Sequence, residues 1–195
     1  MSSNGWHGLA DNVAAHAQNY LDGLAAVAQG EGEDRTVSML LLEVAQVSAA
    51  GAQLGASQDV ILPTNWEPPI SADPDLDELR TALAARLGPV DGYVEVFDPY
   101  KDTSLTPYRL SDDLTAVAAD LVHGLRHYQA GRPLEALWWW QYSYFNTWGN
   151  HAGAALRALQ ALVAHSRLDV EAAEASIEAA MSAVVEEGSQ VQTGR

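Results

Sequence analysis

Three consecutive tryptophans, Trp138, Trp139 and Trp140, lie in an apolar stretch that begins after Arg132 and runs to His165. Apolar residues recur along it at three- and four-residue steps, which predicts one long helix with proline in its first turn. Three neighbouring tryptophans span roughly 200° of a helix surface at about 100° per residue, so one buried face cannot hold them all. The stretch therefore predicts either a nearly surrounded central helix or a tryptophan that projects from it.

A helical wheel with the regular period divides this stretch into an apolar and a polar arc. The apolar arc is the expected core face, and the polar arc is the expected solvent face. The apolar arc includes Trp138, Gln141, Tyr144, Phe145, Trp148 and, at its edge, His151, whereas the polar arc includes Glu135, Trp139, Ser143, Asn146, Asn150 and Arg157.

Gln141 and Trp139 are the exceptions to this division. A buried amide without partners costs about 1–3 kcal/mol, so Gln141 either bonds to a neighbouring helix or loop or lines a small polar cavity. We favour the first interpretation, because most buried amides are structural. Trp139 is either covered, with residues 90–110 as the expected cover, or exposed as an anchor for a partner. We favour the covered state, because large aromatic side chains are usually buried.

The rest of the chain predicts an all-α protein. Ala, Leu and Val dominate the 48% apolar content, which favours helix over sheet. We expect a single-domain bundle of about six helices over residues 1–187, with a disordered tail at 188–195 and two long loops, 56–74 and 90–110. The further helices are expected at about 6–30, 37–55, 76–87, 111–131 and 168–187.

Local features refine three of these segments. Gly51 and its alanine neighbours indicate a close crossing of helices. Residues 93–97 alternate weakly and predict an ordered loop or a minimal hairpin at best, and a loop of this length is often functional. Ser111, followed by Asp112 and Asp113, is expected to cap the next helix with its hydroxyl.

The charge of the chain restricts its partners. There are 26 acidic and 10 basic residues, which gives a net charge of −16. Such a surface disfavours direct nucleic-acid binding, since no basic stripe can displace counterions. A basic protein partner is electrostatically easier, although the charge also serves solubility alone. We expect no signal peptide and no membrane-spanning segment, and we therefore expect a cytoplasmic protein.

Few residues suggest catalytic chemistry. The chain has no cysteine, which excludes thiolate catalysis and Cys-ligated metals. Asp120, His123 and His127 share one helix face with a spacing compatible with metal ligation, but this face partly overlaps the solvent side of the helix, and an ordinary polar face fits them better. We expect no metal and no cofactor.

The Trp-rich helix also carries a family resemblance. Residues 137–144, 146–152 and 155–160, together with the Val96-Phe97-Asp98-Pro99 segment, resemble a bacterial domain-of-unknown-function family that is best populated in actinobacteria. The resemblance implies a small helical cytoplasmic protein without an established activity. It also implies residues that could serve a shared role: Asp98, Asp113, Asp120, Gln141, Trp148, Gly149, His151 and Arg157.

Two functions remain open from the sequence. The leading hypothesis is a non-catalytic interaction or adaptor protein that binds a protein partner, for which a basic protein is electrostatically easier, through residues 90–110 and one side of the central helix. Its partner surface would include Trp139, Asn146, Asn150 and Arg157. The alternative is a small-ligand- or metal-dependent enzyme, whose pocket would include Gln141, Tyr144, Trp148, His151 and Asp98.

Overall fold

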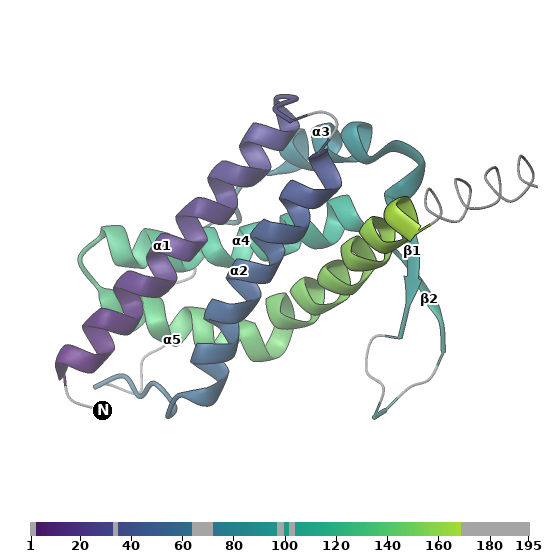
Figure 1. Ribbon diagram of the computed structural model, residues 1–195. Coiled ribbons are helices and arrows are strands. Elements are labelled where there is room, and N and C mark those ends of the chain that lie inside the picture. The colour runs from purple at the N-terminus through teal and green to yellow at the C-terminus, as the bar shows by residue number, and fades with distance from the viewer. Residues whose placement is uncertain (1–2, 33–34, 64–71, 97–99, 102–103, 169–195) are drawn as a thin grey trace, which may run out of the picture. The chain divides into compact units, whose positions relative to one another are not determined.

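A computed structural model of the chain describes residues 3–32, 35–63, 72–96, 100–101 and 104–168 (Figure 1). The chain forms two compact units, residues 1–159 and residues 160–195. All elements below belong to the first unit unless stated otherwise. The predicted disordered tail, most of the predicted helix 168–187, and Asp98 lie outside the described residues.

The first unit is predominantly helical, which confirms the predicted fold class. A long connection, residues 57–76, separates α2 from α3, and two short strands lie between α3 and α4. In chain order the elements are α1 (Ser3–Ala28), α2 (Thr36–Ala56), α3 (Asp77–Leu87), a 3₁₀ turn (Gly88–Val90), β1 (Gly92–Glu95), β2 (Thr106–Arg109), α4 (Leu110–Gln129), α5 (Pro133–Ser143), a π-helix (Tyr144–Trp148) and helical residues 149–159. Residues 160–168, in the second unit, are also helical.

Helices α1 and α2 lie side by side, as their short connection predicts (Figure 1). Gly30 and Gly32 make the turn with φ angles of 91° and 67°, which glycine adopts at little cost. Along α1, the buried side chains recur at helical spacing: Leu9, Val13, Ala17, Tyr20, Leu24 and Val27.

Helix α2 is long and apolar enough to cross a membrane by length and composition alone, unlike any other helix among the described residues. This helix was not singled out from the sequence as one that meets the length of a membrane span. A core helix passes the same test, and α2 buries one face against α1 and α5. The buried residues of that face are Leu40, Val44, Val47, Ala50, Gly51 and Leu54.

Two glycines let the Trp-rich helix approach its neighbours. Gly124 of α4 lies directly against the indole of Trp140, whose Nε1 donates to the Leu121 carbonyl at 3.2 Å. Gly51 of α2 lies against the rings of Tyr144 and Trp148, as the predicted helix crossing requires. A side chain at either glycine would overlap these rings, so the small residues set the spacing of the bundle.

The single long helix predicted for residues 133–165 contains a π-helix at Tyr144–Trp148. The Gly149 N–H donates to the Tyr144 carbonyl, five residues back, so this turn holds one more residue than a regular turn. The helical wheel assumed a regular period, and two of its assignments near this turn were wrong. Ser143, predicted on the polar arc, is 3% exposed, and Phe145, predicted in the core, is 57% exposed.

Strands β1 and β2 form an antiparallel hairpin that pairs Gly92 with Arg109 and Glu95 with Thr106. The sequence predicted at best a minimal hairpin here, and this is the hairpin observed. The second strand was not predicted, because Pro107 reads as a break rather than as part of a strand.

Candidate functional site

Asp113 is the centre of a buried polar network that joins three elements. Its carboxylate is buried, and its Oδ2 accepts a hydrogen bond from the Tyr93 hydroxyl at 2.6 Å. Its Oδ1 lies 2.7 Å from Nδ1 of His151. Tyr93 belongs to β1, Asp113 to the first turn of α4, and His151 follows the π-helix. The network therefore fixes the imidazole of His151 relative to the hairpin and α4.

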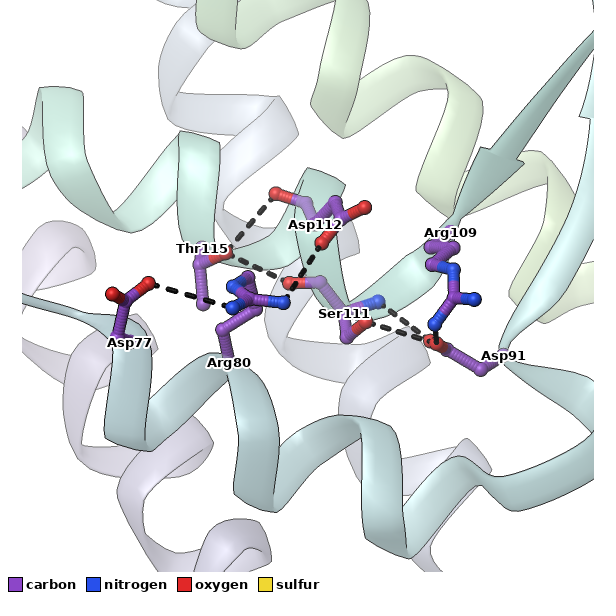
Figure 2. Close-up of polar contacts among 7 residues, drawn as sticks. All are labelled: Asp77, Arg80, Asp91, Arg109, Ser111, Asp112 and Thr115. Atoms are coloured by element: carbon purple, nitrogen blue, oxygen red, sulfur yellow. Dashed lines mark hydrogen bonds and ion pairs between the residues drawn. The ribbon is translucent and has the colours of Figure 1, made fainter.

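The start of α4 is held in place by a second carboxylate, Asp91 (Figure 2). The Asp91 side chain accepts from the Ser111 N–H at 2.8 Å and from the Ser111 hydroxyl at 2.9 Å, and Arg109 lies 3.8 Å from it. Ser111 is thus not the expected cap, because α4 begins at Leu110 and the Ser111 hydroxyl donates outward. Asp91 therefore caps the N-terminus of α4 with a side chain from outside the helix. This contact also positions Asp113, which follows Ser111 by two residues.

Neighbouring contacts on the same turn add to this anchoring (Figure 2). The Thr115 hydroxyl donates to the Ser111 carbonyl at 2.8 Å. Arg80 of α3 lies 3.5 Å from Asp77 and 3.7 Å from Asp112. Asp112 therefore has a cationic neighbour of its own, separate from the Asp113 network.

The π-helix and Gly149 determine where His151 lies. A β-carbon on Gly149 would overlap the Tyr144 carbonyl oxygen and ring, so only glycine fits after this wide turn. Trp148 is fully buried and donates through Nε1 to the Trp140 carbonyl at 3.1 Å. π-Helical turns occur often at functional sites, where they redirect side chains. Here the π-helix ends at Trp148, three residues before His151, so its extra residue changes the helix face on which His151 lies.

His151 lies at the wall of a cavity of about 240 Å³. The cavity is formed by β1, β2, the start of α4 and the helix after the π-turn. Its polar lining residues are Glu95, Tyr108, Asp113, Asn150, His151 and Arg157, and its small lining residues are Gly149, Gly153 and Ala154. A second hollow shares Tyr108, Asp113 and His151 with the first.

Glu95 and Arg157 form an ion pair at this cavity. Glu95 Oε2 lies 3.1 Å from Nε of Arg157, and Glu95 Oε1 accepts from the Val96 N–H at 2.9 Å. The Glu95 side chain is 13% exposed, whereas the Arg157 side chain is 75% exposed. Glu95 therefore orients a guanidinium that is largely open to solvent.

The hydrogen bond to Asp113 defines the chemistry of His151. A carboxylate only accepts hydrogen bonds, so Nδ1 of His151 carries the proton. In the neutral imidazole, Nε2 is then a hydrogen-bond acceptor, and it has no partner among the described residues. A histidine oriented in this way by a carboxylate can take a proton from a hydroxyl group or from water.

Burial and the neighbouring Asp113 carboxylate raise the pKa of the Tyr93 phenol well above its usual value. Both effects disfavour the phenolate, so Tyr93 remains a hydrogen-bond donor to Asp113 at all moderate pH values. The role of Tyr93 is to hold Asp113, and its own proton is not available for transfer.

Gln141 was the centre of the predicted pocket, and the structure gives its amide backbone partners instead. Its Oε1 accepts from the Val60 N–H at 2.7 Å, and its Nε2 donates to the Leu54 and Gln58 carbonyls at 3.0 and 3.2 Å. Gln141 therefore fastens the segment after α2, as the favoured interpretation predicts. Of the other predicted pocket residues, Tyr144 and Trp148 pack on Gly51, and His151 lines the cavity described above.

Trp139 is covered, but not by the predicted cover. It is 8% exposed, donates through Nε1 to the Asp120 carbonyl at 3.0 Å, and lies 5.2 Å from the His123 ring, centroid to centroid. Helix α4 is thus the cover, in place of residues 90–110. Trp139 cannot serve as an exposed anchor. Asn146, Asn150 and Arg157, from the same predicted partner surface, are exposed.

The weak metal candidates Asp120, His123 and His127 have separate partners. Asp120 accepts from the Thr147 hydroxyl, His123 lies 3.2 Å from Asp73, and His127 lies 3.1 Å from Glu135. Both histidines are buried, so the expected partial overlap with the solvent side does not hold for them. Within the described residues, no group of three or more such side chains is arranged to hold a metal ion.

Sequence reasoning missed Tyr93, Glu95 and Tyr108 as site residues. Tyr93 and Glu95 are two positions apart on β1, so they lie on one face of the strand, and Tyr108 pairs with Tyr93 across the hairpin. The alternation in residues 93–97 was the available signal. It could not be used, because the partner strand was not recognised.

The fold and the site together define a helical bundle with a short hairpin, in which a buried carboxylate orients a histidine beside a cavity. Residues 4–165 match the domain-of-unknown-function family DUF5063, and the chain belongs to this family. No curated protein matches the chain. The structure is similar to the crystal structure of protein BF1032 from Bacteroides fragilis, a structural genomics target, with a TM-score of 0.63 and 17% identity over 77% of this chain and 89% of that chain. At this identity the likeness shows the fold alone.

Proposed function

We propose that the protein binds a small polar ligand in the cavity beside His151, with Nε2 of the neutral imidazole as the acceptor for a ligand hydroxyl or amine proton. The observation that carries this proposal is the pair of His151 and buried Asp113, 2.7 Å apart, at the wall of an open cavity. Burial of Asp113 is costly unless its oxygens are bonded, and Tyr93 and His151 supply those bonds.

Gly153 supports a ligand at this place. It lies in the helix that lines the cavity, and a β-carbon built on it would meet no atom within 4 Å. Glycine inside a helix costs about 0.5–1 kcal/mol relative to alanine. The packing of the protein does not require glycine at this position. A ligand that approaches the helix backbone closely would require it.

A fragment screen by ligand-observed NMR tests the proposal. The wild type is compared with Gly153→Leu, which fills the cavity, and with His151→Ala. Gly8→Leu is the matched control, because Gly8 lies in α1 and also has no atom within 4 Å of its β-carbon position. We expect fragments that bind the wild type and Gly8→Leu but neither cavity variant. The proposal fails if no fragment distinguishes the wild type from Gly153→Leu.

A protein partner is the second candidate, because aromatic side chains beside the covered Trp139 are exposed. Tyr142 is 51% and Phe145 is 57% exposed, and Tyr142 stacks on Trp138 with ring centroids 5.2 Å apart. Aromatic residues are enriched at interfaces. This surface replaces the predicted one around Trp139. Affinity capture with the wild type and with Tyr142→Ser/Phe145→Ser tests it, and identical captures would exclude it.

A further inference from the structure

Some of the polar groups that line the cavity beside His151 already have hydrogen-bond partners, and others do not. Each oxygen of Asp113 already accepts one hydrogen bond, from Tyr93 or His151. Each oxygen of Glu95 also accepts one, from the Val96 N–H or the Arg157 side chain. The two carboxylates therefore have donors already, and they do not need a cationic ligand to balance them.

The remaining donors lie on Arg157, Asn150 and Tyr108. Arg157 uses Nε for Glu95, and its Nη1 and Nη2 have no partner among the described residues. The side chains of Asn150 and Tyr108 likewise have no hydrogen-bond partner within the described part of the chain. A guanidinium with two open N–H groups matches the geometry of a carboxylate or a phosphate.

His151 adds one requirement to the ligand. Since its Nε2 is an acceptor in the neutral imidazole, a complementary ligand must present a proton there as well. An acceptor-only anion would leave Nε2 of the neutral imidazole unpaired when it excludes water from the cavity, which weakens its binding.

We infer that the ligand of this cavity is a small anion with a hydroxyl group, whose carboxylate or phosphoryl group binds Arg157 and whose O–H donates to Nε2 of His151. The inference rests on the proposed ligand-binding function and names its ligand class. The cavity is lined by two carboxylates, Glu95 and Asp113, and by one guanidinium, Arg157. Glu95 is paired with Arg157, and the Asp113 oxygens are bonded to Tyr93 and His151.

Isothermal titration with small probes at matched ionic strength tests the ligand class. The probes are glycolate and inorganic phosphate as hydroxylated anions, acetate as an anion without a hydroxyl, and ethanolamine as a cation. We expect glycolate or phosphate to bind more tightly than acetate, and ethanolamine not to bind. The ratio of glycolate to phosphate affinity shows whether the carboxylate or the phosphoryl group is preferred.

Variants separate the two halves of the inference. Arg157→Gln is expected to weaken the binding of the preferred anion about tenfold or more. Arg35→Gln, an exposed arginine before α2 that does not line the cavity, should leave it unchanged. His151→Ala should remove the advantage of glycolate over acetate, while circular dichroism checks that each variant is folded.

Failure of the inferred ligand class can be distinguished from failure of the proposed ligand-binding function. The ligand class is wrong if ethanolamine binds more tightly than glycolate, if Arg157→Gln binds the anions as well as the wild type does, or if no probe binds. If fragments of another class still bind in a manner that depends on Gly153 and His151, the cavity remains a ligand site. If no fragment and no probe depends on these residues, both proposals fail.

Discussion

At the scale of single residues, Tyr93 holds the buried Asp113 carboxylate through a hydrogen bond of 2.6 Å. Tyr93→Phe removes this donor and should lower the free energy of unfolding by about 1–3 kcal/mol at neutral pH. Tyr108→Phe is the matched control on the paired strand, and its effect should stay within about 0.5 kcal/mol. Urea unfolding measures both, and equal effects would show that the hydrogen bond does not stabilise the fold.

Tyr93 should also make the folded protein less stable at high pH. The pKa of Tyr93 is raised in the folded state by burial and by Asp113, whereas an unfolded tyrosine titrates near about 10. Stability from this group is therefore fully present below about pH 10 and is lost as the pH rises above it. Tyr20 and Tyr128 shift in the same direction. Urea midpoints between neutral and alkaline pH should fall less steeply for Tyr93→Phe than for the wild type.

Gln141 shows what a sequence reveals about a single buried polar residue. Its position on an apolar arc predicted a buried amide with structural partners, and this was confirmed. Its partners were not predictable, because they are backbone groups of the segment after α2, more than 80 residues away in the chain. We expect Gln141→Ala to cost about 2–3 kcal/mol. Hydrogen exchange at the Val60 amide should accelerate with it, and unchanged exchange would contradict the role of Gln141 as an anchor.

At the scale of elements, the boundaries of the helices were largely predictable from apolar periodicity, turn glycines and prolines. The π-helix was not, because a wheel with a fixed period has no place for an extra residue. Phe145 lies within this turn and is exposed instead of buried, whereas Ser143 lies before the turn, in α5, and is buried with Trp139 four residues earlier. The π-helix also precedes the helix face that holds His151, so the candidate site could not be assembled from regular helix geometry.

Two alanine substitutions in the same helix test the need for the π-helix. Gly149→Ala places a β-carbon against the Tyr144 carbonyl and ring, and should destabilise the protein by about 1–3 kcal/mol. Gly153→Ala meets no atom within 4 Å and should stabilise it by about 0.5–1 kcal/mol. Thermal unfolding measures the pair. Stabilisation by both substitutions would mean that the wide turn at Tyr144–Trp148 is not enforced by its contacts.

At the scale of the whole molecule, the all-α class followed from composition and periodicity, and membership of the family is shown by the match over residues 4–165. The candidate site was only partly predictable. Asp113 and His151 stood among the residues that the family resemblance singled out, but nothing in their spacing along the chain indicated that they touch. Their contact depends on packing between α4 and the helix after the π-turn, which the sequence pattern does not encode locally.

The net charge of −16 adds a prediction for the molecule as a whole. Repulsion among like charges opposes the compact state, and salt screens it. The thermal midpoint should therefore rise as NaCl is raised to about 1 M, where the Debye length is about 3 Å. A falling midpoint would indicate that the ion pairs, such as Glu95 with Arg157, outweigh the general repulsion.

The most direct test of the central claim is the side-chain ¹H–¹⁵N NMR spectrum of His151 near neutral pH, recorded without and with a ligand found in the fragment screen. We predict that the neutral imidazole carries its proton on Nδ1, toward Asp113, and that the Nε2 resonance shifts when the ligand binds. A neutral imidazole protonated on Nε2, or an Nε2 resonance that does not change at saturating ligand, would contradict the site described for this protein.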